Sequence, residues 1–300
     1  MAVPALGEVW PLLAGLPVLG SFTKKISRGL QWNLKLRVNG QETGNREKLV
    51  FDEWREGTKE GVPPNAKINC FQEPETKYLN VRPEDQRRNP FKAPWDLPKV
   101  ILNATRRSRG PWRISAFADF RGLTCSEAFL AIWPKEPSLA TTIAAILNGP
   151  IANAFAATTR EGARINQKSL LRFPMPRLSV PQRMAIDAAV KEYLDAVSGS
   201  DWSSVDAILR RIDALVLRGY ALPPRLERKV LDCFRGQKRP VPFEFEEYFP
   251  PDFELYFSLG DYLSPKFQAA KAGAVRDRFR KLPEHVLEAM KAAVESYKED

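Results

Sequence analysis

The spacing of apolar residues divides this 300-residue chain into a mixed first part and a helical second part. Three short runs rich in apolar and branched residues predict strands at residues 96–104, 112–120 and 123–133. Because only short turns separate these runs, we expect them to form an antiparallel meander. A helix is predicted next, with Ser138 as its N-cap, and Gly149-Pro150 should break it.

Apolar residues at helical spacing dominate the chain after residue 178. They predict helices from about Pro181 to residue 197, over 203–219, over 222–234 and over 274–297, with Ser179 as a cap of the first. Residues 238–265 are rich in proline and aromatics and predict an irregular strap over the helices. We therefore expect an α+β fold. A mainly antiparallel sheet domain with short helices would cover residues 1–178, and a helical region for docking a partner would cover residues 179–300.

The composition excludes several classes of protein. An apolar share of 44% can fill a core, and no apolar run is long enough to span a membrane. The three cysteines are far apart in sequence, which predicts no disulfide framework and fits a reducing, cytoplasmic setting. A single histidine, His285, removes most histidine-based catalysis and most zinc chemistry, so we expect no metal site in this chain.

The net charge of +10 is unevenly placed along the chain. Residues 1–120 carry +7 (20 basic minus 13 acidic), residues 121–200 carry +3 (9 minus 6), and residues 201–300 carry zero (17 minus 17). A one-sided basic excess argues for a polyanion partner, and an inert basic surface is the open alternative at this point. We therefore expect any polyanion partner to bind through the first two thirds of the chain.

Two windows hold most of the basic surplus, and a polar-aromatic segment near residue 30 adds to them. Arginine can clamp phosphates or read guanine, and amide side chains can pair with adenine. Trp112 has two possible roles, stacking on a base or anchoring its loop in the core, and we favour the core. The candidate DNA-binding residues are Arg28, Gln31, Asn33, Arg87, Arg88, Lys99, Arg106, Arg107, Arg109, Trp112, Arg113, Arg160, Arg164, Asn166 and Lys168.

Motifs for chemistry are weak in this sequence. Asn89-Pro90-Phe91 lacks the second proline of the loop in which amine-directed methyltransferases hold a flipped base. Asp213 with Glu227-Arg228-Lys229 matches the acidic pattern of a metal nuclease, but both stretches have a helical period, and we interpret them as solvated helix faces. We therefore predict no catalytic residue and no cofactor in this chain.

Several segments resemble target recognition domains of restriction-modification systems. The resemblance is carried by residues 23–32, by Lys99 to Leu102 with the arginine loop that follows, by residues 147–155, by Arg164-Ile165-Asn166 and by residues 170–176. Residues 212–228, Gly236 and residues 239–243 resemble the C-terminal regions of some N6-adenine DNA methylases. The resemblance covers roughly residues 19 to 265 and depends mainly on the order and spacing of these motifs.

This resemblance implies a DNA specificity subunit of a restriction-modification or phage-defence system. The methylases of that family also carry a cofactor-binding domain and an Asn-Pro-Pro-aromatic loop, and this sequence shows neither. S-adenosylmethionine or Mg²⁺ would then belong to a separate methylase or nuclease partner. Three alternatives stay open, namely the C-terminal part of a split or divergent N6-adenine methyltransferase or restriction enzyme, a non-enzymatic scaffold with a basic face, and an RNA-binding protein.

Overall fold

The computed structural model describes residues 6–32, 35–38, 41–44, 49–158, 164–245 and 247–269. The chain divides into two compact units, Met1–Leu259 and Gly260–Asp300. The domain border that we predict at residue 178 falls inside the first unit and stays a prediction. The helix predicted over 274–297 lies outside the described residues.

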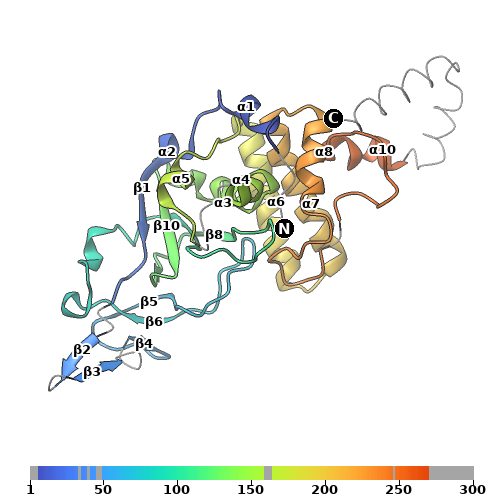
Figure 1. The fold of residues 1–300 in the computed structure, drawn as a ribbon. Coiled ribbons are helices and arrows are strands. Elements are labelled where there is room, and N and C mark those ends of the chain that lie inside the picture. Colours follow the sequence, from blue (N-terminus) through green and yellow to red (C-terminus); the bar gives the residue numbers. More distant parts are fainter. Residues whose placement is uncertain are drawn as a thin grey trace, which may run out of the picture. The chain divides into compact units, whose positions relative to one another are not determined.

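Strands of the first unit form two four-stranded sheets and a separate hairpin (Figure 1). One sheet has the order β1-β10-β7-β8 and is antiparallel throughout. The other has the order β4-β6-β5-β9, in which β5 and β9 run parallel. Strand β2 pairs with β3 in the hairpin. The strands are β1 (Thr23–Arg28), β2 (Lys35–Val38), β3 (Gln41–Gly44), β4 (Val50–Phe51), β5 (Thr58–Val62), β6 (Lys77–Asn80), β7 (Lys99–Asn103), β8 (Ala116–Asp119), β9 (Thr124–Cys125) and β10 (Phe129–Pro134).

The predicted α+β class is confirmed, but the meander is wrong. Strand β10 pairs with β7 on the side away from β8, so its other edge is free to take up β1 from the start of the chain. All residues of β7 are buried, as expected for an inner strand covered on both faces. One face packs into a hydrophobic core with residues from both sheets, which includes Ile101, Phe117 and Trp133. Helix α3 packs against β7 and β8.

Short helices frame the sheets, and longer helices follow them in the chain. The α-helices are α1 (Val9–Leu13), α2 (Leu19–Phe22), α3 (Ala140–Asn148), α4 (Pro150–Thr158), α5 (Gln167–Leu171), α6 (Val180–Ser198), α7 (Trp202–Tyr220), α8 (Pro224–Asp232), α9 (Leu259–Tyr262) and α10 (Pro265–Ala269). The 3₁₀ turns are η2 (Pro83–Asp85), η3 (Pro90–Lys92) and η4 (Pro137–Leu139). Helices α6 and α7 pack against each other and against α3.

Local signals explain where the helices start. The Ser179 hydroxyl accepts a hydrogen bond from the Gln182 backbone, and the Gln182 side chain accepts one from the Ser179 N–H, which completes a capping box. The cap predicted at Ser138 is wrong, because a 3₁₀ turn precedes α3 and makes Leu139 the N-cap. Among the described residues, no single helix has the length and apolar composition to cross a membrane; the bent pair Pro137–Asn148 and Pro150–Thr158 meets that test only when taken together.

Candidate nucleic-acid interface

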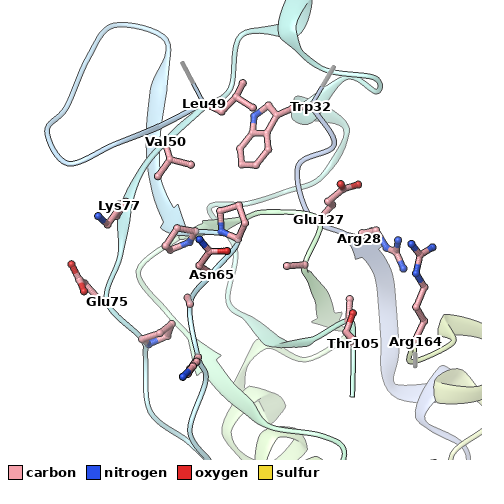
Figure 2. A pocket seen from close by; sticks show the side chains of 17 residues that line it. Arg28, Trp32, Leu49, Val50, Asn65, Glu75, Lys77, Thr105, Glu127 and Arg164 are labelled. Carbon is pink, nitrogen blue, oxygen red and sulfur yellow. The ribbon is translucent and has the colours of Figure 1, made fainter. Parts of the chain in front are cut away.

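A cleft of about 860 Å³ opens in the first unit beside the ends of β1, β6 and β7 (Figure 2). Four cationic and two acidic side chains line it together with apolar and small residues, so its wall carries a net positive charge. The lining residues are Arg28, Trp32, Leu49, Val50, Pro63, Pro64, Asn65, Ala66, Lys67, Pro74, Glu75, Lys77, Ala104, Thr105, Glu127, Ala128 and Arg164.

Arg28 reaches the cleft because β1 ends in a tight backbone contact. The Gly29 N–H donates to the Phe129 carbonyl at 3.0 Å, and the Leu30 N–H donates to the Cys125 carbonyl at 2.7 Å. A Cβ atom at Gly29 would collide with the carbonyl oxygens of Cys125 and Ser126, so the backbone can approach this closely only at glycine. The Arg28-Gly29 step thereby fixes the arginine at the edge of the cleft.

Arg164 joins the same wall from a distant part of the chain. Its backbone forms a bridge with Thr105, and the Ile165 N–H donates to the Ala104 carbonyl at 2.9 Å. Figure 2 shows the guanidinium groups of Arg28 and Arg164 pointing toward one another. Within the described residues, neither guanidinium has a hydrogen bond or an ion pair. Two unpaired cations on one wall form a site that an anion would stabilise.

The basic loop, residues 106–113, adjoins the cleft. It is closed by a hydrogen bond from the Arg107 N–H to the Arg113 carbonyl at 3.0 Å. Arg106, Arg113, Arg164 and Asn166 line a small neighbouring pocket. Burial, with the positive charge of Arg106 adding to it, lowers the pKa of Arg113. The two basic windows of the sequence therefore meet in space.

Two buried asparagines hold the basic loop in place. The Asn153 Oδ1 accepts hydrogen bonds from the backbone N–H groups of Arg113 and Ile114, both at 2.7 Å. The Asn148 side chain accepts from the Ala116 N–H and donates to the Ala116 carbonyl, both at 2.8 Å. Both asparagines lie in the 147–155 segment of the family resemblance, which gave no role for either side chain.

The remaining predicted residues are distributed around these pockets. Arg87, Arg88, Arg109 and Lys168 are exposed, and burial lowers the pKa of the half-buried Arg107. The Gln31 carbonyl accepts from the Arg87 N–H at 2.7 Å, so these two neighbours meet. Asn166 is exposed, and its side chain caps α5. Asn33 and Arg160 lie outside the described residues.

Lys99 and Trp112 must be removed from the candidate DNA contacts. Lys99 is fully buried, where its Nζ pairs with the Asp119 carboxylate and donates to the Trp95 carbonyl at 2.6 Å. Burial outweighs the Asp119 carboxylate and lowers the pKa of Lys99. Trp112 is also fully buried, with its ring centroid 4.1 Å from that of Phe234. Trp112 thus has the core role that we favoured, and neither side chain can reach DNA.

Trp112 belongs to a buried group that we call the Arg239 cluster, formed with Asp213, Arg239 and Tyr248. The Arg239 Nη2 donates to Asp213 at 3.0 Å, and the Tyr248 hydroxyl donates to the same carboxylate at 2.8 Å. The guanidinium lies 4.5 Å from the Trp112 ring centroid. Burial acts to lower the pKa of Arg239, but Asp213, Tyr248 and Cys70 together outweigh it and raise that pKa.

The cluster corrects our interpretation of the nuclease-like pattern. Asp213 and Glu227 do lie on helices, but both are buried and not solvated. Asp213 is neutralised by Arg239, and the Glu227 carboxylate accepts from the Leu259 backbone N–H. In the described part of the chain, no group of three or more histidine, cysteine, aspartate or glutamate residues is placed to hold a metal ion.

No family model matches the chain, and no curated protein matches it either. A solved structure of the Type IIL restriction-modification enzyme MmeI in complex with DNA is similar, with 14% sequence identity and a TM-score of 0.40. The match covers 76% of this chain and 34% of that one, so the chain spans about a third of that enzyme's length.

Proposed function

We propose that this chain is a specificity module for duplex DNA in a restriction-modification or related phage-defence system. The observation that carries the proposal is the pair of unpaired arginines, Arg28 and Arg164, on one wall of a positively charged cleft. Buried cations in this fold are neutralised, as Lys99 is by Asp119, whereas these two are left without a carboxylate. DNA phosphate is an anion that bidentate arginine contacts suit.

The exposed cations around the cleft extend this electrostatic footprint. Arg87, Arg88, Arg109 and Lys168 would contact the phosphate backbone and set the position of the protein without reading sequence. Base recognition would then come from the polar side chains within the cleft. The resemblance to target recognition domains, which rests on the order of several motifs, supports the same division between positioning and reading.

The chemistry of the system would reside in a partner. We propose that a separate methylase or nuclease supplies the S-adenosylmethionine or Mg²⁺ site and docks on the helical region. Incubation of the pure chain with duplex DNA and labelled methyl donor, and separately with Mg²⁺, should give neither methylation nor cleavage. Turnover by the chain alone would instead favour the split or divergent enzyme.

A salt titration of duplex binding tests the DNA proposal. The log of the association constant should fall linearly with the log of the salt concentration, with a slope of about −0.9 for each phosphate contact. Replacing both Arg28 and Arg164 by alanine should weaken binding and reduce that slope by about 2. Arg218→Ala is the matched control, because this exposed arginine on α7 lines neither pocket.

Two results would contradict the proposal. If wild-type protein with its partner binds duplex DNA weakly and without salt dependence, phosphate contacts do not drive binding. If the Arg28 and Arg164 double variant behaves like Arg218→Ala, the cleft is not the contact surface. Displacement of duplex by an acidic protein, or preference for RNA of the same sequence, would favour the corresponding alternative.

A further inference from the structure

Glu127 stands out in the cleft, because a carboxylate opposes the binding of a polyanion. It lines the same cleft as Arg28 and Arg164, and its side chain is exposed. Figure 2 shows it on their side of the cleft, away from Lys77 and Glu75. Among the described residues, no hydrogen bond or ion pair engages this carboxylate. An exposed acid without a bonded partner can accept hydrogen bonds from a ligand that donates them.

The other acid of the cleft is placed differently. Lys77 is already paired with Asp52, whose hydrogen bond and charge raise the pKa of Lys77. The negative charge of Glu75 adds to this rise. The charge of Glu75 thus has a cation beside it. Arg28 and Arg164 lie on the same side of the cleft as Glu127, but among the described residues neither forms an ion pair with it, so this carboxylate keeps its acceptor atoms for a ligand.

The backbone around Glu127 is held firmly enough to position a reading side chain. The Ser126 N–H donates to the Val62 carbonyl at 3.0 Å, and the Phe129 N–H donates to the Ser126 carbonyl at 3.0 Å. On the far side of the turn, the Ala128 carbonyl accepts from the Ala104 N–H at 2.8 Å. Hydrogen bonds to β5 and to the end of β7 therefore fix this turn, as recognition of a base edge requires.

We propose that Glu127 is a specificity-determining residue that accepts a hydrogen bond from the N4 amino group of a cytosine. This inference rests on the proposed function, since it names a base that the cleft reads. An ionised carboxylate only accepts hydrogen bonds. In the major groove, guanine and thymine present acceptors to it, and the N7 acceptor of adenine lies beside its amine. Cytosine presents a donor without a neighbouring acceptor.

Selection of binding sites from a pool of randomised duplex DNA tests this role. Wild-type protein should require cytosine at one position, and replacing that base pair should lower affinity about 10- to 100-fold. Glu127→Ala should lose preference at that position alone. Glu127→Gln should shift the preference toward adenine, which a glutamine amide can bind through two hydrogen bonds. Glu84→Ala, at an exposed acid that lines neither pocket, should select the same sites as wild type.

A modified base supplies a second readout. A pyrimidinone that lacks the N4 amine, placed at that position, should weaken wild-type binding as much as a base change and leave Glu127→Ala unaffected. If both Glu127 variants select the wild-type sequence with unchanged preference, the inference fails while the proposed function stands. If wild-type protein shows no salt-dependent binding to duplex DNA, both fail together.

Discussion

The cleft and the Arg239 cluster use the same kinds of side chain in opposite ways. In the cluster, Arg239 is buried, its charge is neutralised by Asp213, and it donates a hydrogen bond to the hydroxyl of Tyr248. In the cleft, Arg28 and Arg164 share a wall without any carboxylate bonded to them in the described structure. Burial makes an unpaired charge costly, so inside the fold charges are paired, and only at an open surface can they stay available to a ligand.

The two regions are also connected through the basic loop. Trp112 sits at the base of this loop and packs against the guanidinium of Arg239. Arg239 also donates to the Asn148 carbonyl at 3.1 Å, next to the helices that hold the loop. The buried cluster therefore supports the base of the loop that carries the arginines, and this would limit the entropy lost in the proposed binding of a ligand.

Removing Asp213 should have the largest effect on stability. Asp213→Ala leaves the Arg239 charge buried and unpaired, and such a change typically costs about 3–5 kcal/mol. Urea unfolding followed by circular dichroism measures the loss. Glu8→Ala is the control, because it breaks exposed ion pairs with Arg225 and Lys229, whose loss should cost about 0–1 kcal/mol. Equal losses in the two variants would show that the cluster does not stabilise the fold as a buried ion pair.

Removing the Asn153 side chain should have a smaller effect on stability and a second effect on binding. Asn153→Ala leaves the backbone N–H groups of Arg113 and Ile114, at the end of the basic loop, without their acceptor, at a cost of about 1–3 kcal/mol. Duplex affinity should also fall, although Asn153 is buried and cannot touch DNA. Urea unfolding and a binding titration at a temperature where both proteins are folded measure the two effects. Wild-type affinity in a destabilised variant would show that the loop needs no support from α4.

The helices were the most predictable part of this fold. Helices α6 and α7 carry long apolar stripes, and Ser179 or Asp201 caps their first turns, so their ends fall within a few residues of the prediction. The order of the strands was not predictable. It depends on pairing between β1 and β10, about a hundred residues apart, and local patterns carry no information about such contacts.

The sequence predicted which types of residue form the candidate site, but not which of them lie together in space. The polar-aromatic segment near residue 30 identified Arg28 and the second basic window identified Arg164, but only the fold shows that they face one cleft. Lys99 was misjudged because a charged residue in a basic window resembles a surface residue, although it opens an apolar strand that is entirely buried. Glu127 was missed, since one acid in a turn gives no signal until its neighbours in space are known.

The smallest effect should come from removing the cleft arginines, and it separates the two regions most sharply. Arg28→Ala with Arg164→Ala removes two like charges that have no partners, so stability should stay within about 0.5 kcal/mol of wild type. Any change should be a gain, greatest at low salt, where repulsion between the guanidinium groups is least screened. Urea unfolding at low and high salt measures this. A loss above about 1 kcal/mol would mean that these arginines stabilise the fold, and the contrast between an open, unpaired cleft and a closed, paired cluster would no longer hold.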